Sequence, residues 1–170
     1  MLSFTRSMAI LAFGLLGASP VLAAEHTYPG AMCVRTTAGA NAGGLPKVDD
    51  KAQLVNQSST SDLTVVCPVV GPYNDLSGAA PNNKAQVFVK DMHLRENVCC
   101  SARANNVGIV SFGAVTCSSG ADEGNGGNGS YQTLSMTTPS VPFTFTSRYF
   151  HCTVPEIFNG HVSAIRLYRY

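Results

Sequence analysis

Short segments rich in Val, Ile, Thr, Phe and Tyr recur along this chain, separated by clusters of Gly, Pro, Asn and Ser. No stretch of a dozen residues keeps apolar positions at helical spacing without Gly, Pro or β-branched interruptions. Short strands punctuated by turns predict an all-β fold, a single antiparallel β-sandwich or jelly roll of about eight to nine strands. The expected strands cover residues 31–36, 53–58, 63–70, 85–92, 97–104, 107–117, 130–136, 143–154 and 163–170.

Alternation within the last segment predicts which side chains face the core. Ile165 and Leu167 are expected on one face, and Arg166, Tyr168 and Tyr170 on the other. One face of an antiparallel sheet packs on the core, while the other is at least partly exposed to solvent. We also consider this segment as an edge strand through which subunits would assemble.

Two dipeptides are typical of tight turns between strands. Asn105-Asn106 suits a turn because Asn tolerates the left-handed backbone better than most residues. Asn159-Gly160, between the last two segments, is a strong hairpin signal. Both are expected to join neighbouring strands.

The first residues have the pattern of a secretory signal peptide. Arg6 precedes an uncharged apolar run, and Val21 and Ala23 fit the small residues at positions minus three and minus one of a cleavage site. We expect residues 1–23 to be removed, although cleavage one residue later would serve nearly as well. Residues 24–170 then form one secreted or periplasmic domain, large enough for a hydrophobic core.

The charge balance narrows the class of partner. The chain has 11 Lys and Arg against 10 Asp and Glu, and the predicted leader contains one of the cations. Nucleic acid and anionic lipid both call for a basic surface, so neither is the expected partner. No second apolar segment is long enough to span a bilayer, so the mature domain is not expected in a membrane. An extracellular protein or a glycan remains as the kind of ligand to expect.

All six cysteines lie after the predicted leader, and an even number in an exported chain indicates a disulfide framework. Six cysteines allow 15 pairings, so spacing alone does not choose among them. Cys33 and Cys67 lie on two early segments with no cysteine between them, and we expect them to pair.

The adjacent cysteines Cys99 and Cys100 point to opposite faces if they lie on a strand. Cys100 shares its parity with small apolar residues, and Cys99 shares its parity with polar ones. We therefore favour Cys100–Cys152 inside the sandwich and Cys99–Cys117 outside it, while the opposite assignment stays open. The outer bond needs a bulge, for which Gly113 is the candidate, or a different neighbouring strand.

No candidate catalytic, cofactor or metal motif in the sequence has the residue spacing and the surrounding elements that it requires. We therefore expect no enzyme activity, no cofactor and no metal. No C-x-x-C indicates zinc or redox chemistry, and no G-x-S-x-G indicates a serine hydrolase. A G-x-G-x-x-G spacing at residues 124–129 lacks the surrounding strand and helix of a dinucleotide site. The four histidines lack zinc-ligand spacing: His26, His93, His151 and His161.

Three weaker patterns in the sequence concern calcium binding, glycosylation and sugar binding. The acidic pairs Asp49-Asp50 and Asp122-Glu123 lack the alternating spacing of a calcium loop, so calcium is a minor alternative. Formal glycosylation sequons begin at Asn56 and Asn128. Sugar binding would need exposed aromatic rings, and the chain has no Trp. The tyrosines considered for that role are Tyr131, Tyr149, Tyr168 and Tyr170.

Several strand motifs together resemble a group of small uncharacterised exported bacterial proteins. They are V-V-C-P at residues 65–68, V-x-C at 98–100, SYQTLSM at 130–136, C-T-x-P at 152–155 and the final SAIRLYRY. The resemblance implies a secreted β-sandwich with four shared cysteines, matching Cys33, Cys67, Cys100 and Cys152. It implies no activity, because the group has no established one.

These observations favour an exported, non-catalytic β-sandwich that acts as a binding or structural module. The alternative is a lectin-like carbohydrate-binding module or a small secreted hydrolase with a site assembled from loops. Paired acids in a cleft, or a row of exposed tyrosines, would favour this alternative.

Overall fold

The protein is described from a computed structural model, which covers residues 26–36, 43–70, 84–93, 95–106, 108–119, 131–139 and 147–169. The predicted signal peptide and the Gly-rich loop at 124–129 lie outside these ranges. Across these ranges, no helix has the length and apolar character needed to cross a membrane. A single 3-10 turn, η1 (Gly30–Met32), is the helical element of this part of the chain.

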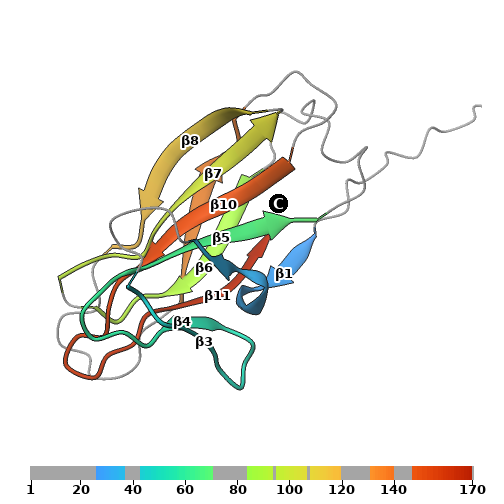
Figure 1. The fold of residues 1–170 in the computed structure, drawn as a ribbon. Helices are drawn as coiled ribbons and strands as arrows, with labels where there is room; N and C mark the ends of the chain where they lie inside the picture. The colour runs from blue at the N-terminus through green and yellow to red at the C-terminus, as the bar shows by residue number, and fades with distance from the viewer. Residues whose placement is uncertain are drawn as a thin grey trace, which may run out of the picture.

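One layer of the molecule is a six-stranded antiparallel sheet, ordered β3-β4-β11-β6-β9, with β1 also paired to β11. Figure 1 shows β6 and β11 of this sheet behind the second layer. The strands of this sheet are β1 (Thr27–Pro29), β3 (Pro46–Val48), β4 (Leu54–Asn56), β6 (Lys84–Lys90), β9 (Tyr131–Thr137) and β11 (Ala164–Arg169).

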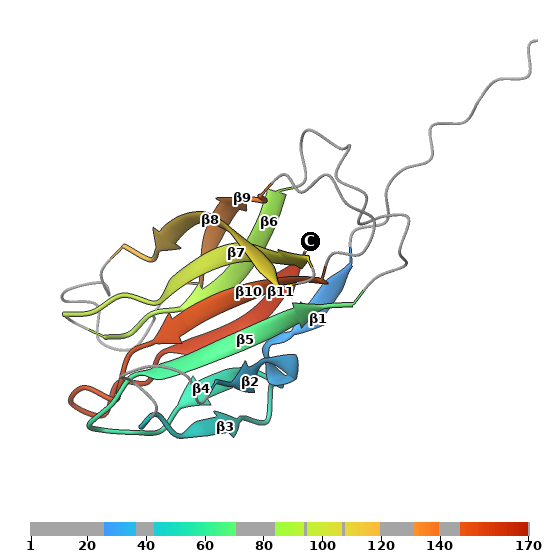
Figure 2. The ribbon, with the colours of Figure 1, turned by 45° about the horizontal axis from the view of Figure 1, so that its top comes forward.

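The second layer is a five-stranded antiparallel sheet, ordered β2-β5-β10-β7-β8. Figure 2 shows β5, β10 and β7 running side by side in it. Its strands are β2 (Val34–Arg35), β5 (Leu63–Val69), β7 (Cys99–Asn106), β8 (Ile109–Cys117) and β10 (Ser147–Val154). The predicted fold class, a disulfide-stapled antiparallel β-sandwich, is confirmed. Strands β1 and β3 were not predicted from the sequence.

Alternating side chains from the two sheets form one core. Every second residue of β5 is buried, beginning with Leu63 and Val65, and so are Val87 and Val89 of β6. Each fully buried aliphatic side chain contributes about 1.5–3 kcal/mol relative to an exposed one.

An aromatic cluster in this core contradicts the expected orientation of Tyr168. Its ring is fully buried, stacks on Tyr28 with 5.1 Å between centroids, and meets the edge of Phe150 at 5.6 Å. Its hydroxyl donates to the Pro68 carbonyl at 2.8 Å, and burial raises the pKa of Tyr168 above its usual value of 10.0. The prediction that Tyr168 shares the outer face with Arg166 is therefore wrong.

Strand β11 is also not the edge strand that the sequence suggested. It lies between β4 and β6, so its backbone is paired on both sides. The edges are instead β1, β3 and β9 in one sheet and β2 and β8 in the other. Subunit assembly by edge pairing of β11 is therefore excluded.

The two predicted turns have different outcomes. Asn159 and Gly160 have positive φ values of 51° and 80° and form a tight turn closed by Phe158 and His161. This turn does not join neighbouring strands, because β10 and β11 belong to different sheets.

The turn expected at Asn105-Asn106 is misplaced by two residues. Asn106 pairs with Ile109, so both asparagines belong to β7, and the reversal includes Gly108 at a φ of 90°.

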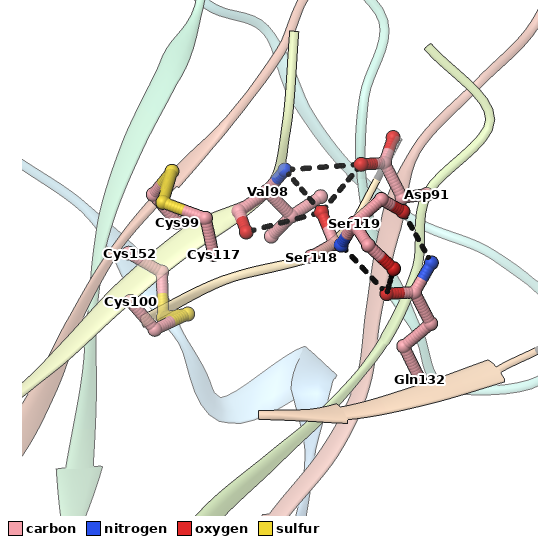
Figure 3. The surroundings of a disulfide bond; sticks show 9 residues. All are labelled: Asp91, Val98, Cys99, Cys100, Cys117, Ser118, Ser119, Gln132 and Cys152. Atoms are coloured by element: carbon pink, nitrogen blue, oxygen red, sulfur yellow. Dashed lines mark hydrogen bonds between the residues drawn. A yellow bond between two sulfur atoms is a disulfide. The ribbon is translucent and has the colours of Figure 1, made fainter. Parts of the chain in front are cut away.

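The three disulfides are Cys33–Cys67, Cys99–Cys117 and Cys100–Cys152. The pairing is the one that strand parity favours. Cys100 and Cys152 are directly opposite in register and almost fully buried, whereas Cys117 is exposed. Figure 3 shows the two bonds that leave the adjacent cysteines.

The predicted bulge at Gly113 exists and completes the outer disulfide. The pairing of β7 with β8 shifts by one residue between Ser101 and Arg103, which brings Cys99 opposite Cys117. A Cβ atom on Gly113 would lie 2.6 Å from the Thr137 carbonyl oxygen of β9. Only glycine permits this approach of the two edge strands.

A buried carboxyl group joins the two sheets beside these disulfides. Asp91, directly after β6, accepts hydrogen bonds from the backbone N–H of His93 at 3.0 Å and of Val98 at 3.3 Å. It also accepts from the hydroxyl of Ser163 at 3.1 Å and from that of Ser118 (Figure 3). Because these donors flank strands of both sheets, Asp91 fixes one end of the sandwich.

Candidate functional site

A bulge in β11 determines which of its side chains reach the outer surface of the six-stranded sheet. Ile165 pairs with Val89 and Leu167 pairs with Phe88, so Arg166 is an extra residue between two ladder positions. Beyond the bulge the alternation is reversed. Tyr168 therefore points into the core, and Arg169 comes to the same outer face as Arg166.

Each of these arginines lies over an aromatic ring from another strand of the same sheet. The Arg166 guanidinium carbon is 4.5 Å from the ring centroid of Tyr131, and the Tyr131 hydroxyl accepts a hydrogen bond from Gln53 at 3.1 Å. The Arg169 guanidinium carbon is 5.5 Å from the ring centroid of Phe88. Such cation–π contacts restrict where a long side chain can point.

The Arg169 side chain is fixed at a second point. Its Nε donates a hydrogen bond to the side-chain oxygen of Gln86 on β6. Gln86 in turn donates to the hydroxyl of Ser135 on β9 at 3.1 Å. The arginine is therefore connected to β6, the strand beside its own, and through Gln86 to β9 beyond it.

Two lysines complete a surface that we call the basic face, defined as Lys47, Lys90, Arg166 and Arg169. Lys47 pairs with Val55, and Lys90 lies opposite both Ala164 and Tyr131, so these residues form one row across all five strands of the path. No Asp or Glu occurs at the described positions that point outward in these rows. The nearest acids along the chain are Asp91, which follows Lys90 and is buried, and Asp49 in the β3–β4 turn, whose carboxyl accepts the N–H groups of Lys51 and Gln53 at 2.9 Å each.

The outer surface of the five-stranded sheet is different, because it carries one permanent cation. Arg103 lies over Phe112 at 4.9 Å, and its Nε donates to Ser101 at 3.1 Å. Burial and the nearby Arg103 charge lower the pKa of His151 below 6.5. At neutral pH this surface therefore has a single positive charge, and Phe112 is 64% exposed.

The tyrosines considered for sugar binding do not form a row. Tyr131 is exposed but lies against Arg166, Tyr168 is in the core, and Tyr149 is half-buried on the opposite sheet. Tyr170 lies outside the described residues. A platform of stacked sugar rings on tyrosines is therefore not what the fold provides.

Carboxyl groups gather at one end of the five-stranded sheet, which sequence reasoning missed. Asp62 precedes β5 and Glu156 follows β10, and these strand ends are paired in register. Glu96 joins them from the loop before β7. Burial and then the Asp62 charge raise the pKa of Glu96, and the nearby His93 offsets only part of this rise. The register of two strands was the signal that would have placed these acids together.

We expect Glu96→Gln to stabilise the protein at pH 7 by at most about 1 kcal/mol, the range of exposed charge pairs. Because the folded-state pKa of Glu96 is raised above 4.5, its ionisation destabilises the fold as pH rises through that value. The gain should therefore disappear below about pH 4, where the carboxyl is protonated in both states. Urea unfolding at both pH values measures it, with Asp50→Asn as the control. A variant no more stable than the parent at pH 7 would contradict this account.

His93 has a structural role. His93 is buried, and its Nδ1 accepts the backbone N–H groups of Arg95 at 3.1 Å and Glu96 at 2.7 Å. Among the residues that the structure covers, no group of three or more His, Cys, Asp or Glu could hold a metal ion.

Asn56, the first residue of the first sequon, is fully buried, and its amide donates to three backbone carbonyls. The folded protein therefore does not present it for glycosylation.

The remaining surface predictions concern loops. The Asp122-Glu123 pair and the sequon at Asn128 lie outside the described residues. The Asp49-Asp50 pair forms the β3–β4 turn, where the Asp49 carboxyl is used by backbone N–H groups.

Comparison with known proteins gives little guidance. A scan against protein-family models finds no match, and a search of curated proteins finds none. Among solved structures, the fold is similar to a family two carbohydrate esterase from Cellvibrio japonicus, with a TM-score of 0.44 and 11% identity. The alignment covers 86% of this chain and 33% of the esterase chain, so this chain spans about a third of that protein's length. A likeness at this level says nothing about activity.

Proposed function

We propose that this protein is exported and acts outside the cytoplasm as a non-catalytic binding module, with an anionic polymer as its ligand. The observation that carries the proposal is the basic face. Four cations from three strands point outward from one sheet, and two of them are held over aromatic rings. The leader-like first 23 residues and the three disulfides support export.

Charge segregation explains how a chain with almost no net charge binds a polyanion. Among the described residues, the acids lie at the sandwich end, in the β3–β4 turn and at the buried Asp91 position, while the basic face has none of them. A surface of one sign attracts an oppositely charged partner whatever the total charge of the molecule. The total charge of the chain, which disfavours a polyanion as partner, does not describe this surface.

The spread of the cations favours a polymer over a small anion. Lys47 on β3 and Lys90 on β6 are separated by three strand spacings, which is about 14 Å. A single phosphate or carboxylate contacts only one or two of these groups. An extended ligand contacts all four.

The polar clusters outside the basic face support a role without catalysis. Ser118, His93 and Asp91 are near one another, but all three are buried and Asp91 is used by structural donors.

We expect Lys90→Glu/Arg166→Glu to weaken binding of heparin by about tenfold or more at low salt, because charge reversal turns attraction into repulsion. Affinity electrophoresis and isothermal titration of the mature protein measure the change. Raising the salt concentration should weaken binding of the parent protein, because exposed charges are screened.

The control is Arg103→Glu, which reverses one charge on the outer surface of the opposite sheet and is compared with Arg166→Glu alone. This control should retain heparin affinity within about twofold, because Arg103 is on the surface that faces away from the basic face. Equal losses in the two single variants would show that only total charge matters. No retention of the parent protein by any polyanion would refute the proposed function.

A further inference from the structure

We infer that the anionic polymer is a glycan bearing carboxylate groups, which are paired by Arg166 and Arg169. This inference rests on the proposed function and specifies its ligand. The two guanidinium groups are held in fixed orientations. A fixed orientation favours recognition of an oxyanion of matching geometry over simple attraction between charges.

Both arginines are oriented before a ligand arrives. Arg166 lies on Tyr131, whose hydroxyl is bonded to Gln53, and Arg169 lies over Phe88 with its Nε bonded to Gln86. A guanidinium group presents a planar fork of N–H donors that matches the two oxygens of a carboxylate. Holding the fork in place removes part of the entropy that binding would otherwise lose.

The spacing of the arginines suits a linear chain of sugars. Arg166 and Arg169 are three residues apart along β11, which is at most about 10 Å of strand because the bulge at Arg166 shortens it. Two consecutive pyranose rings of an extended chain cover such a span. A polymer lying along β11 therefore brings one carboxylate to each arginine when every sugar, or every second sugar, is acidic.

The groups beside the arginines favour sugars over nucleic acid. Thr133 and Ser135 on β9 expose hydroxyl groups, and the Gln86 amide lies next to Ser135, so the surface offers partners to sugar hydroxyls. Single-stranded nucleic acid is bound largely by stacking its bases on aromatic rings. Here Tyr131 and Phe88 each carry an arginine, and the described part of the chain has no helix to enter a groove.

The test is a pair of substitutions that keeps the charge and removes the fork, Arg166→Lys/Arg169→Lys. The probes are polygalacturonate, its fully methyl-esterified form, dextran sulfate and double-stranded DNA, each measured by affinity electrophoresis and titration calorimetry. The parent protein should bind polygalacturonate best and its esterified form at least about tenfold more weakly, because the ester removes the charge that the arginines pair. The lysine variant should lose about tenfold in affinity for polygalacturonate, because an ammonium is a point charge without the planar fork.

Two further outcomes separate this inference from the proposed function. If the lysine variant binds polygalacturonate as well as the parent does, while Lys90→Glu/Arg166→Glu abolishes binding, the basic face is a general polyanion surface and the carboxylate inference is wrong. The same holds if DNA or dextran sulfate binds more tightly than polygalacturonate. If no probe binds the parent protein, the proposed function itself fails. Thermal unfolding of the lysine variant, expected to match the parent, excludes a folding defect as the cause.

Discussion

Removing the inner disulfide with Cys100→Ala/Cys152→Ala should lower the free energy of unfolding by about 4 kcal/mol. The two cysteines are 52 residues apart, and a cross-link over a loop of that length reduces the entropy of the unfolded chain by this amount in the chain-entropy model. The bond also joins β7 to β10 in the middle of the five-stranded sheet, where both side chains are buried. Urea unfolding of the oxidised double variant measures the loss.

The outer disulfide is the matched control. Its cysteines, Cys99 and Cys117, are 18 residues apart, so its removal should cost about 3 kcal/mol. Because Cys117 is exposed, mild dithiothreitol should open this bond in the folded protein before it opens Cys100–Cys152. Peptide mapping after partial reduction shows the order. Loss of the inner bond first would contradict the assignment of the two bonds to opposite faces of the sheet.

Asp91→Ala should destabilise the protein by about 4 kcal/mol, because breaking a buried polar network leaves its partners without an acceptor. The carboxyl is 2% exposed and accepts two backbone N–H groups and two hydroxyls. These donors flank strands of both sheets, so the loss also loosens one end of the sandwich. Chemical unfolding gives the free energy, and hydrogen exchange should show lost protection around Val98.

Asp49→Ala provides the comparison for Asp91. The Asp49 carboxyl also accepts two backbone N–H groups, but it lies in a surface turn where water replaces it. We expect a loss of about 1 kcal/mol, typical of a single capping side chain. Similar losses for the two variants would mean that the Asp91 network does not connect the sheets.

The alternation of side chains along a strand was enough to predict the disulfide pairing of Cys99 and Cys100. Successive side chains on a strand point to opposite faces, so Cys99 and Cys100 had to leave β7 in opposite directions. The polarity of their neighbours then indicated which one was inside. The misplaced turn at Asn105-Asn106 did not change this result, because parity within a strand does not depend on where the strand ends.

The bulge in β11 could not be predicted, and the basic face depends on it. In a regular strand, residues 166 and 169 point to opposite faces because they are an odd number apart. Tyr168 reaches the core, and Arg169 the surface, only after the register shift beside Arg166. A bulge is determined by packing against β6 and the core, which are contacts between distant parts of the chain.

The order of the strands was equally beyond local rules. Strands β10 and β11 are consecutive in the chain, yet they lie in different sheets. A turn signal such as Asn159-Gly160 specifies a reversal of direction and does not specify which sheet the next strand joins. For the same reason the acids Asp62, Glu96 and Glu156, which are far apart in the sequence, were not expected to meet.

The central claim is that the outer surface of the six-stranded sheet binds an anionic polymer. Its most direct test is an amide chemical-shift titration of the isotope-labelled mature protein with a heparin-derived hexasaccharide, which carries both carboxylates and sulfates. We predict that the largest shifts occur at Lys90, Tyr131, Arg166 and Arg169. Shifts confined to Arg103, Tyr149 and Phe112 on the opposite sheet, or no saturable shifts at all, would contradict the claim.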